Sequence, residues 1–189
     1  MRLHRLLPTL ALAAFAAIGF TLPAQAESNA YLHLKGARGD IKGDAKLRGR
    51  EDAIVVIAAS HELNAPRDAA SGLATGKRQH KPFMITKELD RSTPLLRQAW
   101  ATNETLPTAT IDFYRPTPRG GIAMEEKYLT IKLTNASIAT IRQVMLNNKN
   151  PELTRYAQYE EVSFTYQKIE WIWVDGNVTA SDSWEAPHP

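Results

Sequence analysis

The sequence contains no cysteine among its 189 residues. This absence excludes disulfide bonds, thiolate metal sites and thiol nucleophiles, so ordinary core packing has to stabilise the fold. Histidines are few, and their spacing contains no HExxH or HxH pattern: His4, His33, His61, His80 and His188. The sequence therefore predicts no metal site and no cofactor.

A strong charge of one sign is also lacking once the first residues are set aside. Residues 1–26 combine a short basic head, an apolar stretch from Leu6 to Phe20 and the small-x-small site Ala24-Gln25-Ala26. This is the pattern of a cleavable secretory signal, and the apolar stretch is too short to span a membrane. We expect cleavage after Ala26, export to the periplasm and secretion, with no stable membrane insertion.

Removal of this signal changes what the charge implies. The full chain has 23 Lys and Arg against 20 Asp and Glu, with a sequence pI of about 9.2. Without Arg2 and Arg5, residues 27–189 carry 21 basic and 20 acidic residues. The predicted mature chain is one globular domain of nearly neutral charge, and no nucleic-acid partner is expected.

Alternation of apolar and polar residues dominates this domain, as in half-buried strands. We predict strands over 31–35, 53–59, 83–89, 108–114, 127–141, 162–174 and 178–184. The 53–59 run is apolar throughout, which predicts a strand that is covered on both faces. The alternation changes phase near Asn135-Ala136, which predicts a bend or bulge, and again at Gln167-Lys168, which predicts a bulge or a corner where the strand passes between two sheets.

Connections between the strands are marked by glycine and proline. Residues 36–51 are rich in glycine and basic residues and predict an exposed loop. Residues 64–81 predict a second, flexible connection, and residues 115–121 predict a turn.

One helix is predicted after residue 92. Thr93 is the expected N-cap and Pro94 the first helical residue, with an apolar stripe that pairs Leu95 with Ala99 and Leu96 with Trp100. The fold class that follows is mainly β, an antiparallel two-sheet β-barrel or sandwich with one short flanking α-helix.

No catalytic constellation emerges from the sequence, so the chain is not expected to be an enzyme. Ser60 and His61 are neighbours that point to opposite faces of a strand and cannot share a hydrogen bond there. Residues 72–78 depart from a phosphate-binding loop in spacing and lack its Ser or Thr. The paired carboxylates Glu125-Glu126 and Glu160-Glu161 are expected to be solvated at strand entrances.

Ordered blocks of residues resemble the Hcp family, the haemolysin-coregulated tube proteins of type VI secretion systems. They run in order from about Tyr31 to Trp184 and include Gly43-Asp44-Ala45-Lys46, Thr75-Gly76-Lys77-Arg78, Ser92-Thr93-Pro94-Leu95-Leu96, Ile111-Asp112-Phe113-Tyr114-Arg115-Pro116, Tyr128-Leu129-Thr130-Ile131 and Glu160-Glu161-Val162-Ser163-Phe164. The resemblance implies a small β-barrel whose copies join head-to-tail into hexameric rings, a heterologous interface that closes at six.

The family resemblance also implies partners. Its rings stack into a secreted tube that works with a contractile sheath and a spike protein and carries small effectors. Family members have an extended loop after the first strand that touches the neighbouring ring, and residues 36–50 occupy that position here. The residues assigned to ring stacking on this basis are Arg38, Asp40, Lys42, Lys46, Arg48 and Arg50.

One feature departs from the family pattern, because tube subunits ordinarily assemble in the cytoplasm and lack a cleavable signal. Three functional hypotheses follow. The first is a ring-forming tube subunit or secreted effector carrier. The second is an exported monomeric binding or adhesion protein on the same scaffold, with the 36–50 loop as its contact surface. The third is a hydrolase with an unrecognised site, for which few histidines offer a base.

Overall fold

The structure is a computed structural model that describes residues 29–119 and 122–184. The predicted signal at residues 1–26 lies outside the described residues. Within those residues no helix is long and apolar enough to cross a membrane.

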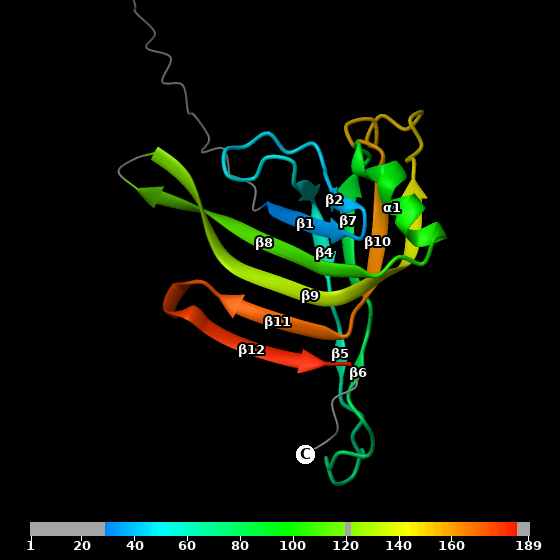
Figure 1. Cartoon of the computed structure of the whole chain (residues 1–189), viewed down its shortest axis with the longest axis vertical. Helices are drawn as coiled ribbons and strands as arrows, with labels where there is room; N and C mark the ends of the chain where they lie inside the picture. The colour runs from blue at the N-terminus through cyan, green and yellow to red at the C-terminus, as the bar shows by residue number, and fades with distance from the viewer. Residues whose placement is uncertain (1–28, 120–121, 185–189) are drawn as a thin grey trace, which may run out of the picture.

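The described chain forms antiparallel strands and one α-helix (Figure 1). The strands are β1 (Ala30–Gly36), β2 (Gly39–Ile41), β3 (Ile54–Val56), β4 (Ala58–Ser60), β5 (Leu63–Asn64), β6 (Gln79–His80), β7 (Phe83–Glu88), β8 (Leu106–Arg119), β9 (Ile122–Val144), β10 (Tyr159–Thr165), β11 (Lys168–Trp173) and β12 (Val178–Ser183). The helix α1 spans Ser92–Ala101, and a 3₁₀ turn, η1, spans Asp175–Asn177.

Two sheets pack face to face around one main core. The strand order is β2-β1-β8-β9-β10-β7-β4, with β3 paired to β1, β11 to β9 and β12 to β11. This path is open at both ends, so the predicted sandwich with a flanking helix is confirmed, whereas the barrel does not close. The fully buried core side chains come from both sheets and from α1 and include Leu32, Ile54, Phe83, Ile85, Leu96, Leu106, Leu133, Val162, Phe164 and Ile169.

The bend predicted near Asn135-Ala136 and the corner predicted at Gln167-Lys168 are both confirmed. Strand β9 pairs with β11 up to Thr134, with β8 up to Ala136 and with β10 from Ser137 onward. Asn135 lies between these stretches with φ of 49°, a left-handed conformation that asparagine tolerates better than most residues. The second corner lies between Thr165 and Lys168, where the chain leaves the sheet of β7 and enters the sheet of β12.

The prediction of one doubly covered strand over 53–59 is wrong. The run divides into β3, which pairs with β1, and β4, which pairs with β7. The chain passes from one sheet to the other at Ile57, which is 53% exposed. Val55 is also exposed. An apolar run can thus supply two short edge strands, which continuous hydrophobicity alone does not reveal.

The predicted turn at 115–121 is wrong for most of its length. Strands β8 and β9 continue as a paired ribbon to Arg119 and Ile122. The N–H of Tyr114 points away from β9, because it donates to the carbonyl of Asn29 at 2.9 Å. Pro116 and Pro118 follow at two-residue intervals, so their missing N–H groups fall on the same open edge, where a strand tolerates proline.

Helix α1 begins differently from the prediction. Its first turn is capped by Asp90, whose carboxylate accepts from the Ser92 N–H at 2.8 Å, and Thr93 lies inside the helix. Of the four residues in the predicted apolar stripe only Leu96 and Ala99 are buried, whereas Leu95 and Trp100 are 42% and 53% exposed. A short helix on the side of a sheet buries one narrow stripe, so half of the predicted apolar face remains in solvent.

Candidate interaction surfaces

The exposed loop predicted for 36–51 is found only in part: most of its residues are exposed, but the segment 36–52 also packs on the body. It contains β2, and Ile41 at the end of β2, Gly43 and Ala45 are buried at alternate positions. The Gly43 N–H donates to the Asp52 carbonyl at 2.8 Å, and the Ala45 N–H donates to the Ala53 carbonyl at 3.1 Å. These contacts hold the segment against the body of the sandwich.

Arg50 anchors the end of this segment. Its guanidinium lies 3.6 Å from the centre of the Tyr114 ring and 4.9 Å from that of Tyr31, and it forms an ion pair with Glu125. The Arg50 side chain is only 12% exposed. Glu125 is therefore not the freely solvated strand-entrance residue that the sequence predicts, because it neutralises a cation held between two aromatic rings.

The structure separates the six residues assigned to ring stacking into two groups. Arg50 is anchored as above, and Lys42 pairs with Asp52 at 2.8 Å. The hydrogen bond from Lys42, and then that from Arg91, lowers the pKa of Asp52 below its ordinary value. The other four are exposed and make no side-chain hydrogen bond or ion pair with any residue that the structure describes: Arg38, Asp40, Lys46 and Arg48.

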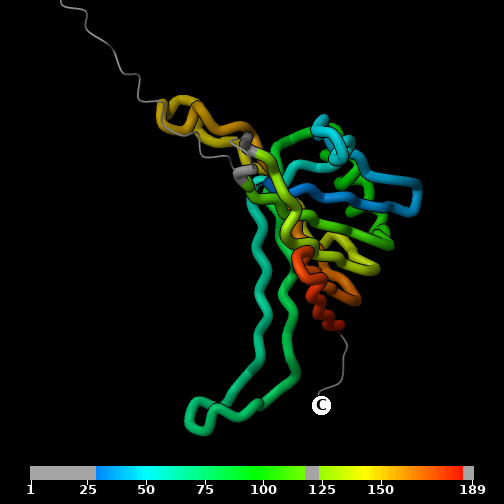
Figure 2. Tube along the Cα trace, turned by 90° about the vertical axis from the view of Figure 1, so that its left-hand side faces the viewer, coloured from blue at the N-terminus to red at the C-terminus, as the bar shows by residue number. Residues whose placement is uncertain are grey.

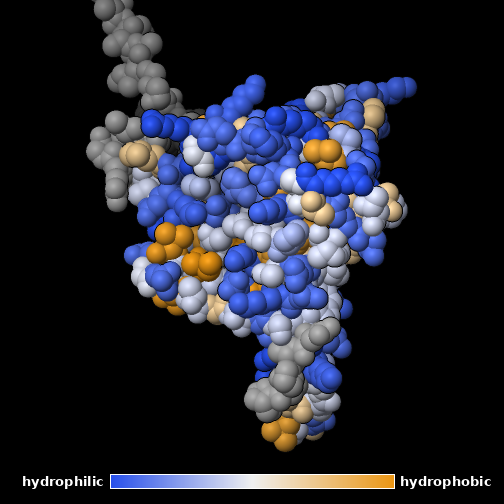
Figure 3. Space-filling model, in the orientation of Figure 1, coloured by the Kyte–Doolittle hydropathy of each residue, from blue (hydrophilic) through white to orange (hydrophobic). Residues whose placement is uncertain are grey.

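Residues 61–82, here called the arm, project far from the body (Figures 1 and 2). Strands β5 and β6 pair with each other, and a single bridge joins Arg67 to Ala74 farther out. At the tip Leu73 is 69% exposed, and an apolar patch marks the tip in Figure 3. A two-stranded ribbon is at best marginally stable alone, so the arm is the part of the chain best placed to gain from a neighbouring molecule.

The base of the arm is held by a row of polar side chains. The Tyr166 hydroxyl lies 2.6 Å from Nε2 of His61 and 2.9 Å from Nδ1 of His80. Asp182 accepts from Arg78 at 3.1 Å and faces Nε2 of His80 at 3.3 Å. Burial, followed by the charge of His80, lowers the pKa of His61. His61 thus contacts Tyr166 and belongs to no Ser-His-Glu triad.

At the opposite end of β4 and β7 lies a groove made of two adjoining depressions of about 350 and 340 Å³. Both are lined by Ile57 and Glu88. The full lining is Asn29, Asp44, Val55, Ile57, Thr86, Glu88, Leu89, Asp90, Leu146, Arg155, Tyr156, Ala157, Tyr159 and Glu161. Four of its five charged residues are acidic, so the groove combines apolar contacts with negative charge.

The groove and the arm are complementary in charge and opposite in position. The arm leaves the body after Ser60 and returns at Phe83, whereas the groove surrounds Ile57 and Glu88 at the far end of the same two strands. The arm contains four cationic and two acidic residues: Arg67, Lys77, Arg78 and Lys81 against Glu62 and Asp68. Copies arranged head-to-tail along these strands would bring opposite charges together.

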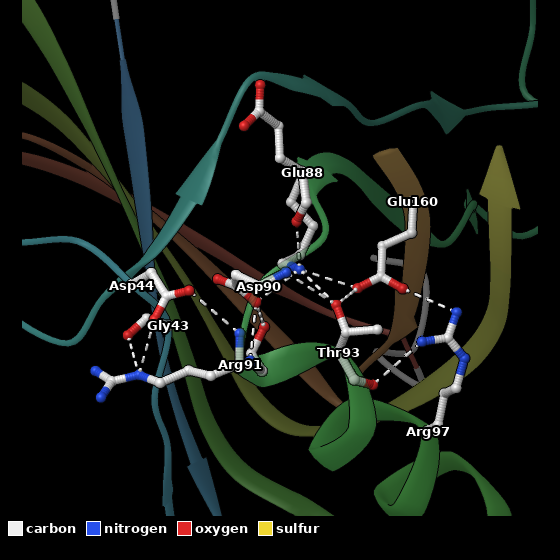
Figure 4. A network of polar contacts seen from close by, with 10 residues as sticks. Gly43, Asp44, Glu88, Asp90, Arg91, Thr93, Arg97 and Glu160 are labelled. Carbon is white, nitrogen blue, oxygen red and sulfur yellow. Dashed lines mark hydrogen bonds and ion pairs between the residues drawn. The ribbon is translucent and has the colours of Figure 1, made fainter. Parts of the chain in front are cut away.

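A buried charge network next to the groove was not predicted (Figure 4). Nζ of Lys87 lies 2.9 Å from carboxylate oxygens of both Glu160 and Asp90, and Arg97 lies 3.2 Å from the other oxygen of Glu160. Lys87 and Glu160 are fully buried. Burial would raise the pKa of Asp90, but the hydrogen bond from Ser92 and the Lys87 ammonium lower it below its usual value.

This network connects α1 to β7 and β10 and corrects the expectation that Glu160 is solvated. The alternation of residues along the two strands contained the signal for this ion pair. Lys87 lies on the same strand face as Phe83 and Ile85. Glu160 lies on the same face as Val162 and Phe164. Two opposite charges at inward positions on paired strands predict a buried ion pair. The register places Lys87 directly opposite Glu160.

Among residues 29–119 and 122–184 no group of His, Asp and Glu side chains is arranged to hold a metal ion. Many of the polar groups that the described chain brings together pair with one another, as at the base of the arm, whereas Oε2 of Glu160 in the Lys87 network is buried with an ion pair to Arg97 and no hydrogen bond. The arm, the groove and the exposed residues of 36–50 are surfaces open to other molecules.

Comparisons with known proteins agree with this architecture. The family model described as "Type VI secretion system effector, Hcp" matches residues 31–173. A protein of Pseudomonas aeruginosa, the "Major exported protein", is 37% identical over 148 residues, which cover 78% of this chain and 84% of that protein.

Solved structures of Hcp proteins also resemble this chain. A crystal structure of an Hcp protein superposes with a TM-score of 0.77 at 30% identity and covers 85% of this chain and all of that chain. A doubly substituted Hcp1 from the E. coli EAEC 042 pathovar gives a TM-score of 0.71 at 36% identity, over 82% of this chain and 97% of that chain. The chain therefore belongs to the Hcp family of type VI secretion system proteins.

Proposed function

We propose that the chain is a structural subunit that forms hexameric rings, that the rings stack into a tube of a type VI secretion system, and that the tube is secreted and carries small effectors. The role is one of assembly and not of catalysis, and a contractile sheath and a spike protein are the further partners. The observation that carries the proposal is an unpartnered arm at one end of β4 and β7 and a complementary groove at the other. Unlike surfaces at opposite ends of a subunit make head-to-tail contacts, and the assembly stays open where the rotation between copies does not close, as stacking along a tube requires.

Ring stacking in this proposal uses the arm of one subunit and the groove of a subunit in the next ring. Arg38, Asp40, Lys46 and Arg48 contribute from the rim of the body, because their side chains are exposed. Arg50 supports the segment from within through Glu125, whereas Lys42 pairs with Asp52 at its surface.

A charge-swap experiment tests this arrangement. The arm variant is Arg67→Glu with Lys77→Glu, and the groove variant is Asp44→Lys with Glu88→Lys. Each variant alone places like charges at every stacking contact, so we expect rings that do not stack. A mixture of the two restores opposite charges at both contacts, and we expect stacks of alternating rings in negative-stain microscopy.

The controls separate ring formation from stacking. Lys35→Glu changes an exposed charge on β1 and should leave stacking unchanged. Hexamers in all variants, measured by light scattering, with no recovery of stacking in the mixture would reject the arm-to-groove contact and retain the ring. A wild-type chain that stays monomeric at every concentration would reject the tube role and favour an exported monomeric binding protein.

Export forms a separate part of the proposal. We infer that residues 1–26 direct the chain to the periplasm and are removed after Ala26. N-terminal sequencing of the protein from periplasm and culture medium should give Glu27 as the first residue, in strains with and without a contractile apparatus. An intact N-terminus on the secreted protein would contradict this inference.

A further inference from the structure

A depression of about 470 Å³, here called the corner depression, lies beside the bend at Asn135 and the sheet corner at Gln167. Its volume is within the range of sites that bind small molecules. All seven side chains that line it are hydroxyls, amides or aromatic rings, and none carries a charge. The groove, in contrast, contains five charged residues. The corner depression is therefore suited to a ligand that is polar but uncharged.

Two amide side chains form a polar pair in the lining. Nδ2 of Asn135 donates to Oε1 of Gln167 at 2.8 Å. This bond leaves Oδ1 of Asn135 and the NH2 group of Gln167 without a partner among the residues that the structure describes. The pair thus offers a free acceptor beside free donors. Neighbouring hydroxyl groups of one ligand fit such a pair, because each hydroxyl both donates and accepts.

Three hydroxyl side chains add further polar groups to the lining. The hydroxyls of Thr105 and Ser137 make no hydrogen bond with any part of 29–119 and 122–184. The Thr165 hydroxyl donates to the Ser137 carbonyl at 3.3 Å and keeps its own acceptor lone pairs. Water satisfies such groups in solution, so a ligand that displaces it has to supply hydrogen bonds in return. The lining therefore favours a ligand with several hydroxyl groups.

Aromatic rings supply the apolar part of the lining. Trp184 packs on Tyr166 with ring centres 5.3 Å apart and on His80 at 5.6 Å, yet the residue remains 36% exposed. Tyr166 is buried, and its hydroxyl contacts His61 and His80, so it supports the tryptophan from below the surface. A partly exposed indole offers a flat apolar surface together with an N–H donor. This combination matches a sugar ring, which has an apolar C–H face and a rim of hydroxyls.

Backbone hydrogen bonds hold the amide pair and the indole in place. The Gln167 N–H donates to the Thr134 carbonyl at 3.1 Å, and the Gln167 carbonyl accepts from the Trp184 N–H at 2.9 Å. Asn135 has a left-handed backbone conformation, with φ of 49°. The groups that would contact a ligand are therefore positioned before it arrives, which lowers the entropic cost of binding.

We propose that the corner depression binds a neutral saccharide, with the C–H face of one sugar ring on Trp184 and neighbouring hydroxyls on Asn135 and Gln167. A ligand carboxylate or phosphate would find no cation in the lining, so anionic sugars and nucleotides are selected against. The site lies within one chain and does not depend on the formation or stacking of rings.

Isothermal titration calorimetry of the full chain tests this site with three probes. N,N′-diacetylchitobiose represents the N-acetylglucosamine units of bacterial cell walls, lactose represents animal cell-surface glycans, and glucuronate is an anionic sugar. We expect at least one of the two neutral disaccharides to bind with a Kd of about 1 mM or below. Glucuronate should bind at least about tenfold more weakly. The disaccharide that binds more tightly identifies the source of the ligand.

Variants locate the binding to the corner depression. Trp184→Ala removes the aromatic surface and should weaken disaccharide binding at least about tenfold. Trp100→Ala is the matched control, because it removes an exposed tryptophan from α1 and should leave binding unchanged. Gln167→Ala should weaken binding about fivefold and replaces Trp184→Ala if that variant does not fold.

Three results would overturn the proposal. The first is the absence of binding by both neutral disaccharides, and the second is binding of glucuronate as tight as theirs. The third is an equal loss of affinity in Trp184→Ala and Trp100→Ala, which would place the sugar elsewhere on the chain.

Discussion

Residues 36–52 and the arm at 61–82 are alike in composition and opposite in structure. Both connect strands, and both contain glycines and several cations, so each predicts a loop. The first lies against the body and ends in the buried cation of Arg50, whereas the second extends into solvent (Figure 2). The comparison shows that glycine and charge content predict where a sheet is interrupted but not whether the connection packs on it.

The two segments differ in how their apolar and small residues are spaced along the chain. In the first segment Ile41, Gly43 and Ala45 alternate with charged residues, and this period of two lets the chain continue beside the sheet with its small side chains inward. The arm has no such alternation between Asn64 and Gln79, and its apolar Leu73 is exposed. The first segment therefore packs within one chain, while the arm leaves its apolar tip exposed to solvent.

Among the substitutions considered, Gly43→Ala should reduce the stability of the fold the most, because it lies in the packed 36–52 segment. A Cβ at Gly43 would lie 2.4 Å from the Ala53 carbonyl oxygen and 2.5 Å from the Ile54 Cα, and backbone cannot move aside cheaply. We expect the free energy of unfolding to fall by about 3 kcal/mol in urea denaturation. Gly76→Ala in the arm is the matched control, because its Cβ would meet only Pro66 at 3.6 Å.

For the control we expect stability to be unchanged or raised by about 0.5 kcal/mol, since alanine restricts the unfolded chain. Both variants should be measured at the same protein concentration, because assembly adds to apparent stability. Equal effects at the two glycines would show that the 36–52 segment is not packed as described.

Arg50→Met is expected to have the next largest effect. It removes the cation between Tyr31 and Tyr114 and leaves Glu125, whose side chain is 27% exposed, without its partner. We expect a loss of about 2 kcal/mol in the free energy of unfolding. Arg48→Met, at an exposed position of the same segment, should change it by less than about 0.5 kcal/mol, and a similar loss in both variants would argue against the anchor.

Leu73→Ser tests the arm, and it should have the smallest effect on the stability of the fold. Its side chain is at the exposed tip of the arm, so the free energy of unfolding should change by less than about 0.5 kcal/mol. Stacking of rings should nevertheless weaken in sedimentation experiments, because the apolar contact with a neighbour is lost. Unchanged stacking would remove Leu73 from the interface.

Much of the fold could be predicted from the sequence because alternation records which residues face the core. The bend at Asn135 and the sheet corner at Gln167 were both predicted from phase changes. The same reasoning, applied to Lys87 and Glu160, would have predicted the buried ion pair, but their charge favoured a solvated interpretation. For a charged residue that has a partner in the core, the alternation pattern therefore predicts burial better than the residue type does.

The groove could not be predicted in this way. It combines residues near Asp44, Ile57, Glu88 and Tyr156, which are separated along the chain and meet only through the pairing of β4, β7 and β10. Nor could the projection of the arm be predicted, because a connection of the same length could equally have folded back on the sheet. Both features depend on the tertiary arrangement and not on local pattern.

The most direct test of the account uses the absence of cysteine from the chain. With Leu73→Cys at the arm tip and Ile57→Cys in the groove, each copy carries one thiol at either end, and a short bismaleimide can join only these positions. The account predicts a ladder of covalently linked copies on a denaturing gel, and single links at most when either cysteine is present alone. Hexamers that yield no ladder from the double variant would contradict the arm-to-groove contact.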